Sequence, residues 1–260
     1  TWVVGRYLGA DALAAVGSSY TLMTFLTSII LGLCMGSGAA ISMQYGSGEY
    51  DKMRQSIFMS FVSIAGISVI LNILVYIGMD VILWILQVPT DIQPLMKKYL
   101  IIIFMGIIAT FLYNYFANVL RAIGNSVIPL VFLAVSSILN VILDMAFVMV
   151  FHWGVAGAAL ATITAQAFSA LYCFMIVRKI DIVHTSKEDF EKVPGLNRKL
   201  LGLGAPILFQ DVIISVGGLA VQFVINGYGF LFVAGFTATN KLYGVLEMAA
   251  ISYGYAVVSY

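Results

Sequence analysis

Residues 136–168 run SSILNVILDMAFVMVFHWGVAGAALATITAQAF, two apolar segments on either side of a Trp-Gly pair. Asp144 is the only Asp, Glu, Lys or Arg among them. A helix needs ~20 apolar residues to cross the hydrocarbon layer of a membrane. The connection around Trp153 is short, so helices on either side of it would be antiparallel neighbours. The stretch therefore predicts a helical hairpin that crosses a membrane twice.

The rest of the chain has the same character. Of its 260 residues, 62% are hydrophobic and only 10% are charged, whereas a soluble domain carries roughly 25% charged residues. Asp, Glu, Lys and Arg are absent from 12–48, 55–79, 99–120, 122–143, 145–177 and 212–240. We expect an all-α, polytopic bundle of transmembrane helices. The net charge of +1 argues against a nucleic-acid partner.

The expected helices follow from these runs. A helix tail is predicted at 1–8, and a short amphipathic stretch at 80–88 ends at Pro89. The predicted spans lie near 18–44, 55–79, 98–121, 126–151, 155–178 and 199–227, with an eighth beginning near 232. Nine basic residues fall in loops on one side of this arrangement and three on the other, which places the first side in the cytoplasm.

One loop divides the chain. Residues 178–199 carry 10 of the 25 charges. We interpret 179–198 as a cytoplasmic connector between a first bundle, 1–178, and the start of a second, 199–260. A shift of 220 residues sets Gly9 on Gly229, with weak similarity around both, as expected if the two bundles are repeats. The sequence begins and stops within helical patterns, so we expect a fragment.

Asp144 is the most informative residue. A charge within a span costs ~2.5–3.5 kcal/mol on insertion scales. Ser136, Asn140 and Asp144 follow at a spacing of four and form one polar stripe. Counting outward from Trp153 at 1.5 Å per residue pairs Asp144 in depth with Thr162, and Asn140 with Gln166. Carboxylate, amide and hydroxyl oxygens suit Na⁺ or a carried proton. The alternative is a hydrogen-bond cluster that only packs two helices.

Three other ionisable residues lie within spans: Asp211, Glu247 and Lys241. Counting outward from the turn at 226–229 brings Asp211 and Glu247 within about one helical turn in depth. They could share a proton or line a cavity for a cationic substrate. The alternative is a structural pair that involves Lys241, or solvation near the cytoplasmic end.

Several kinds of site are not indicated. His152 and His184 lie far from any cysteine at ligand spacing, so no metal is expected beyond a coupling Na⁺. The glycines at 32–38 lack a following Lys-Ser/Thr, and they fit close helix packing rather than phosphate binding. No nucleophile–base pair stands out, so the protein is not expected to be an enzyme.

The sequence resembles the multidrug and toxic compound extrusion family. VGRYLGADALAAVG (4–17) is similar to the end of that family's first helix and the following loop, and QYGSG (44–48) to its second-helix exit. RAIGNS (121–126) with Pro129 resembles its link from the fourth to the fifth helix. LNVILD (139–144) followed by WGVAGAALAT (153–162) is the most specific match.

This resemblance implies two six-helix lobes that export organic cations in exchange for Na⁺ or H⁺ by alternating access. The chain would cover the end of the first helix to the start of the eighth. Asn140, Asp144 and Thr162 match the family's cation site in the first lobe, and that site's first-helix Asp would precede Thr1. It implies no cofactor besides the coupling ion. The expected partners are a cationic amphipathic small molecule and membrane lipid, with no obligate protein partner, in a bacterial inner membrane.

Three alternatives remain open at this point. One is a flippase for lipid-linked sugars from a related superfamily, although such proteins are expected to line their cavity with basic residues. The others are an ion channel and a membrane-embedded enzyme.

Overall fold

The computed structural model describes residues 2–183 and 195–258, and every element in those ranges is helical. In chain order they are α1 (Trp2–Gly46), α2 (Tyr50–Ile85), α3 (Gln93–Met105), α4 (Ile107–Ala122), α5 (Val127–Asp144), the π-helical turn η1 (Met145–Val150), α6 (Gly154–Val177), the 3₁₀ turn η2 (Asp181–Val183), α7 (Leu196–Asn226) and α8 (Phe230–Val258). The all-α prediction is confirmed. Within the predicted connector, 184–194 lie outside the described residues.

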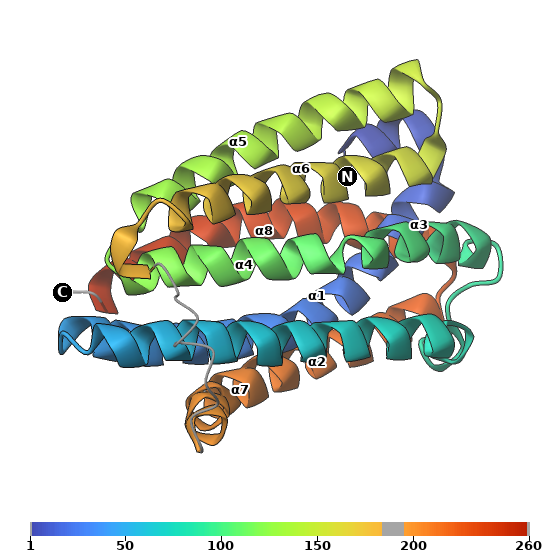
Figure 1. Ribbon diagram of the computed structural model, residues 1–260. Coiled ribbons are helices and arrows are strands. Elements are labelled where there is room, and N and C mark those ends of the chain that lie inside the picture. The colour runs from blue at the N-terminus through green and yellow to red at the C-terminus, as the bar shows by residue number, and fades with distance from the viewer. Residues whose placement is uncertain (1, 184–194, 259–260) are drawn as a thin grey trace.

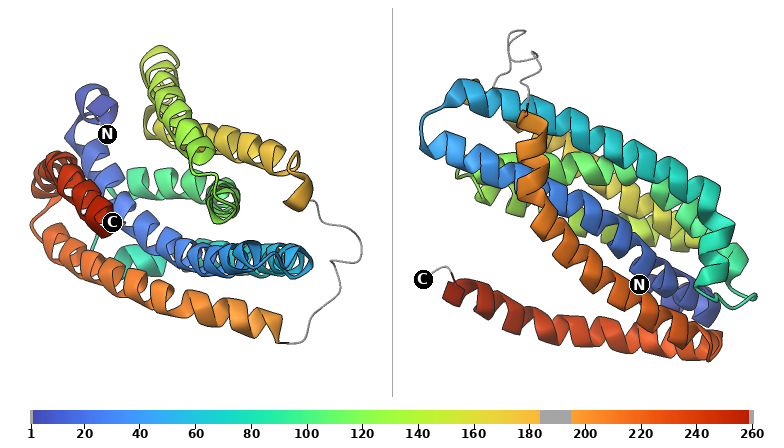
Figure 2. Two further views of the ribbon diagram at one scale, coloured as in Figure 1. Left: turned by 90° about the vertical axis from the view of Figure 1, so that its left-hand side faces the viewer. Right: turned by 90° about the horizontal axis from the view of Figure 1, so that it is seen from below.

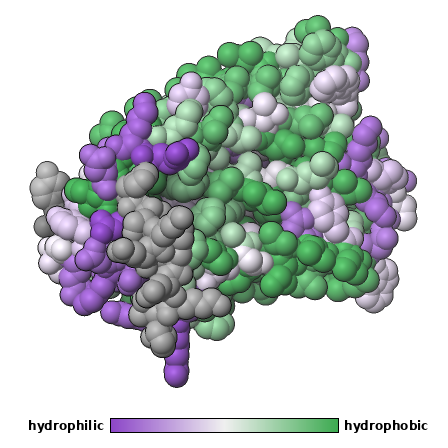
Figure 3. Space-filling view, in the orientation of Figure 1, coloured by the Kyte–Doolittle hydropathy of each residue, from purple (hydrophilic) through white to green (hydrophobic). Residues whose placement is uncertain are grey.

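The helices have the length and composition of membrane spans. Among the described residues five are long and apolar enough to cross a membrane, and a sixth results if α3 and α4 count as one bent span. Hydrophobic side chains form a broad band over the middle of the molecule, and hydrophilic ones gather at its two ends (Figure 3). This is the surface that a multi-pass membrane protein presents to lipid and to the water on either side.

The helix ends separate into two groups along the long direction of the bundle. The end of α1, the start of α2, the end of α4 and the start of α5 lie together at the left of Figure 1. Lys52 of α2 and Arg121 of α4 therefore lie at one end, the end predicted to be cytoplasmic. Lys97, at the start of α3, lies at the opposite end, where it pairs with Asp80 at 2.6 Å.

Two helix boundaries differ from the prediction. The helix tail ends at Gly9, where φ is +86° and ψ is −175°, but α1 resumes at once instead of forming a loop before residue 18. Residues 10–17 include four alanines and one leucine, which are strong helix formers. The helix α2 likewise continues into the predicted amphipathic stretch and stops at Ile85, just before Pro89.

The predicted span at 98–121 is broken at Gly106. The axes of α3 and α4 meet there at 46°. A Cβ atom on Gly106 would lie 2.2 Å from Cγ2 of Ile163 on α6, a distance that side chains do not tolerate. The glycine thus lets α6 approach the break closely.

The most extensive helix pairing is between α1 and α7, which run antiparallel. Both views in Figure 2 show α7 lying alongside α1. A Cβ atom on Gly36 would lie 2.1 Å from Cα of Gly204, and one on Gly32 would lie 2.6 Å from Cα of Leu208. Glycines four residues apart therefore let the two backbones meet, which confirms the prediction of close helix packing at these positions.

The weak repeat has a counterpart in the backbone. Gly9 and Gly229 have the same φ of +86°, and each immediately precedes a long helical run. The helices that follow them, α1 and α8, also contact each other. At this contact a Cβ atom on Gly17 would lie 2.0 Å from Oγ1 of Thr237.

Candidate functional site

A polar cavity of about 300 Å³ lies between α4, α5 and α6. It contains four residues of the predicted site: Ser136, Asn140, Thr162 and Gln166. The hairpin of α5 and α6 therefore brings amide and hydroxyl groups to one place within the membrane-spanning part of the bundle. The remaining lining residues are Tyr113, Asn114, Leu133, Ser137, Ala165 and Ser169.

The pairing across the hairpin differs by one turn from the depth count. Asn140 Nδ2 donates to Oγ1 of Thr162 at 3.4 Å, whereas the count had set Asp144 opposite Thr162. The cause lies in η1, which directly follows Asp144. A π-helical turn holds more residues than an α-helical one, so Asp144 lies closer to the turn at Trp153 than an ideal α-helix would place it.

The helix α4 supplies partners that the hairpin count did not include. Thr110 Oγ1 donates to Oε1 of Gln166, and Asn114 Nδ2 donates to the carbonyl oxygen of Thr110 at 2.8 Å. The sequence carried a signal for this, because Thr110, Asn114 and Asn118 follow at a spacing of four inside an apolar run. Gln166 thus lines the polar cavity and is also hydrogen-bonded to α4.

Asp144 lies at the end of α5, one turn beyond Asn140, and is 9% exposed. Its Oδ1 is buried and has no hydrogen-bond partner among the described residues. A buried carboxylate oxygen that accepts no hydrogen bond is costly in a membrane interior. Binding a proton or a cation would remove that cost.

The ligands available beside Asp144 limit the kind of ion. Among the described residues no three His, Cys, Asp or Glu side chains come together. The nearest polar residue before it on α5 is Asn140, one turn away, whose amide donates to Oγ1 of Thr162. One carboxylate with amide and hydroxyl oxygens offers a hard, singly charged site, which matches Na⁺ or H⁺ better than a transition metal.

Comparison with known proteins identifies the family of the chain. The sequence model of the family described as MatE matches residues 1–146, which include α1 to α5 and Asp144. The chain belongs to the MatE family.

Relatives extend the match to the whole chain. "Probable multidrug resistance protein YpnP" of Bacillus subtilis (strain 168) is 34% identical over 258 residues, which cover 98% of this chain and 57% of the relative. "Multidrug export protein MepA" of Staphylococcus saprophyticus is 24% identical over 233 residues, 86% of this chain and 51% of the relative. The chain thus spans little more than half the length of these MatE relatives.

Solved structures share the fold. The structure titled "Inward-facing conformation of a multidrug resistance MATE family transporter of the MOP superfamily" gives a TM-score of 0.83 at 22% identity, over 92% of this chain and 55% of that one. The structure of "MATE multidrug transporter DinF-BH in complex with R6G" also gives 0.83 at 22% identity, over 91% of this chain and 54% of that one. Identities this low bear on the fold alone.

Asp211 and Glu247 are not joined in this MatE chain. Asp211 is half-buried on α7, and Glu247 is exposed on α8 beside a different cavity. No hydrogen bond or ion pair connects them within the described part of the chain. Lys241 forms an ion pair with neither of them. Its Nζ instead lies 3.4 Å from the ring centroid of Tyr20 on α1.

A buried polar network that the sequence did not reveal joins α1 to α7 at the end opposite to Gly36. Gln222 Nε2 donates to Oγ of Ser18 at 3.0 Å and to Oδ1 of Asn226 at 2.8 Å. Asn226 Nδ2 donates to the carbonyl oxygen of Leu86 at 2.7 Å, and Thr21 Oγ1 to Oε1 of Gln222 at 3.2 Å. The partners on α1 and α7 lie more than 200 residues apart in sequence, and Leu86 lies 140 residues from Asn226, so no local pattern links the three segments.

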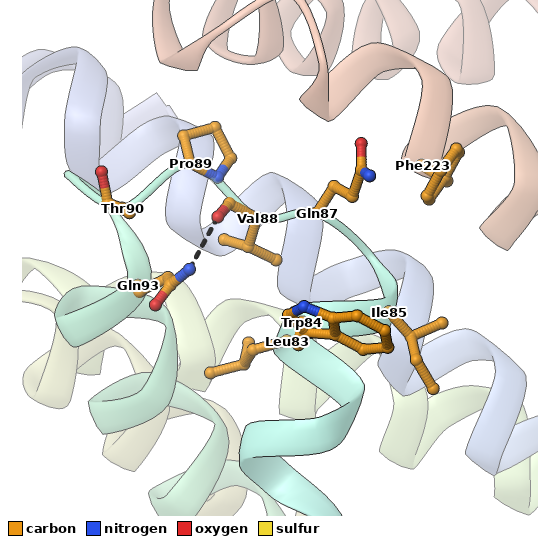
Figure 4. Close-up of a pocket in the computed structure, with 9 residues that line it drawn as sticks. All are labelled: Leu83, Trp84, Ile85, Gln87, Val88, Pro89, Thr90, Gln93 and Phe223. Atoms are coloured by element: carbon orange, nitrogen blue, oxygen red, sulfur yellow. Dashed lines mark hydrogen bonds between the residues drawn. The ribbon is translucent and has the colours of Figure 1, made fainter.

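A larger pocket lies beside this network, at the corner between α2 and α3. Figure 4 shows its apolar wall, with Trp84 below, Phe223 of α7 at one side and Gln93 donating to the carbonyl oxygen of Val88 at 2.8 Å. Its volume is about 560 Å³ and none of its lining residues is ionisable. It therefore has no group with which to couple an ion, and the smaller cavity near Asp144 remains the candidate site.

Proposed function

We propose that the protein containing this chain exports amphipathic organic cations from the cell, driven by entry of Na⁺ or H⁺. The observation that carries the proposal is the buried Asp144 carboxyl, with one oxygen unpartnered, one turn from a polar cavity inside a transmembrane hairpin. The names of the relatives, multidrug resistance and multidrug export proteins, support a drug as cargo.

Coupling follows from competition for one carboxylate. Asp144 binds either the coupling ion or the cationic cargo, so the arrival of one releases the other. Asn140 and Thr162 supply neutral oxygens that hold the ion on the side of the carboxylate facing the cavity. A site that binds its two ligands exclusively links their movements without a further energy source.

Transport then requires that the site open to each side of the membrane in turn. In the proposed mechanism, residues 1–178 move as one lobe against a second lobe that begins at 199, by alternating access. The seam between α1 and α7 is the surface along which this movement takes place. The proposed location is the cytoplasmic membrane of a bacterium, with the basic helix ends inward.

Ethidium efflux tests the proposal. Proteoliposomes holding the protein that contains this chain are loaded with ethidium, and Na⁺ and pH gradients are imposed separately. Efflux driven by one gradient identifies the coupling ion, and Asp144→Asn should abolish it with protein yield unchanged. Asp80→Asn is the matched control, because it removes a carboxylate that is exposed at the bundle's end and paired with Lys97. Efflux by Asp144→Asn at the wild-type rate would exclude the role given to Asp144.

A further inference from the structure

A second cavity, of about 460 Å³, lies between α1 and the pair α7 and α8, apart from the cavity of the hairpin. Its walls are partly aromatic and partly polar. Tyr20 and Thr21 come from α1 and Gln222 from α7, while Asn240, Lys241 and Glu247 come from α8. No residue of the Asp144 site lines it, so its ligand chemistry is set by other groups.

Lys241 gives this cavity a cationic group. The other Lys and Arg residues of the predicted spans are end residues (Lys98, Arg121, Arg178 and Lys199), whereas Lys241 lies well inside its span. Its Nζ lies over the Tyr20 ring, 3.4 Å from the centroid, and it makes no ion pair within the described residues. One aromatic face replaces only part of the hydration that an ammonium group loses in a membrane. The ammonium carries three N–H donors, and an anionic group in the cavity would accept from those that point away from the ring.

Glu247 gives the same cavity an anionic group at a distance from the first. It lies six residues after Lys241 on α8, which is about 9 Å along a helix axis. The two charges are therefore too far apart along the helix for their side chains to pair closely, and the described residues show no ion pair between them. Tyr20 and Tyr243 place aromatic surface in the same cavity.

We propose that this cavity binds zwitterionic aromatic amphiphiles, with the anionic group of the ligand on Lys241. The ring system of the ligand lies against Tyr243, and its cationic end faces Glu247. This inference rests on the proposed export function and gives the cargo a second binding position, apart from Asp144. It assigns Lys241 the choice between zwitterions and simple cations. A lysine acts here as a point charge that accommodates carboxylates of different geometry.

Two dyes with one ring system test the assignment. Rhodamine B carries a free carboxylate, whereas its ethyl ester is a permanent cation. Equilibrium binding of each dye to the purified protein containing this chain is measured by fluorescence polarisation. The wild type should bind both dyes. The measured quantity is the affinity for rhodamine B divided by the affinity for its ester. Lys241→Met should lower this ratio at least tenfold, and Lys241→Arg should keep it within about twofold of the wild-type value.

The outcomes separate the inference from the proposed function. A purely structural lysine would weaken both dyes equally, and an unchanged ratio in Lys241→Met would overturn the assignment. Failure of the wild type to bind rhodamine B would overturn it as well, even if the ester binds and is exported. Selective binding without gradient-driven efflux of either dye would keep the assignment and reject the export function. Glu247→Gln should weaken the ester and rhodamine B together, since both carry the cationic end.

Discussion

The close contact between α1 and α7 predicts that a side chain at position 36 would destabilise the protein. A Cβ atom there would lie 2.1 Å from Cα and 2.3 Å from N of Gly204. Both are backbone atoms, so no side-chain rotation relieves the overlap. Ordinary contact begins near 3.4 Å, so Gly36→Ala must separate the helices locally by about 1.3 Å, the difference between 3.4 Å and 2.1 Å.

Such an opening is expensive because packing attraction falls steeply with distance. A gap of ~0.5–1 Å forfeits a quarter to a half of a contact's attraction, and overpacked sites lose about 1–3 kcal/mol. We expect Gly36→Ala to cost about 2–3 kcal/mol of stability. Gly38→Ala is the matched control two residues away, since its Cβ would lie 3.7 Å from the nearest atom, on Asn118. That variant should stay within ~0.5 kcal/mol of wild type.

The assay is thermal unfolding of the purified protein in detergent, monitored as the fraction of protein that remains monodisperse after heating. Gly204→Ala gives an intermediate point, because its Cβ would lie 3.3 Å from the carbonyl oxygen of Gly32. The expected order of stability is Gly38→Ala, then Gly204→Ala, then Gly36→Ala. Equal midpoints for Gly36→Ala and Gly38→Ala would refute the close approach of the two backbones.

Three further variants test polar contacts. Asn226→Leu leaves the buried carbonyl oxygen of Leu86 without its donor and should cost about 2 kcal/mol, seen as a lower unfolding midpoint; a wild-type midpoint would argue against the network. Tyr115→Phe removes the hydroxyl that lies 2.8 Å from Oγ of Ser60 and should cost ~1 kcal/mol in the same assay, whereas a gain in stability would contradict the contact. Thr110→Val keeps the shape of α4 but removes the donor that holds its glutamine partner. Transport by this variant should need a severalfold higher concentration of coupling ion, and an unchanged half-saturating concentration would exclude a role for α4 in the site.

The sequence predicted that polar residues of the two hairpin helices come together, because a short turn limits which residues can share a depth. Asn140 and Thr162 lie together for that reason, although the π-helical turn moved the pairing by one helical turn. The carboxyl group of Asp144 lies one turn farther along α5. A π-helical turn depends on local packing and leaves no periodic mark in an apolar run.

Other features lay beyond sequence reasoning because they depend on how distant helices face each other. The predicted span is broken at Gly106, where Ile163 of α6 comes close to the backbone. No local sequence pattern indicates this approach. Equal depth suggested a pairing of Asp211 with Glu247, but depth does not fix the direction in which a side chain points. Lys241 lies over an aromatic ring of another helix, which only the packing of α1 on α8 determines.

The contact between Gly17 and Thr237 sets a limit on the packing of α1 against α8. Their numbers differ by 220, the same shift that relates Gly9 to Gly229. If the two bundles are repeats, as the sequence predicts, a residue that touches its own equivalent lies on the two-fold axis that relates them. Both side chains compete for one volume there. Packing therefore restricts the combined size of the two residues. Thr237 fits on α8 because residue 17 of α1 is a glycine.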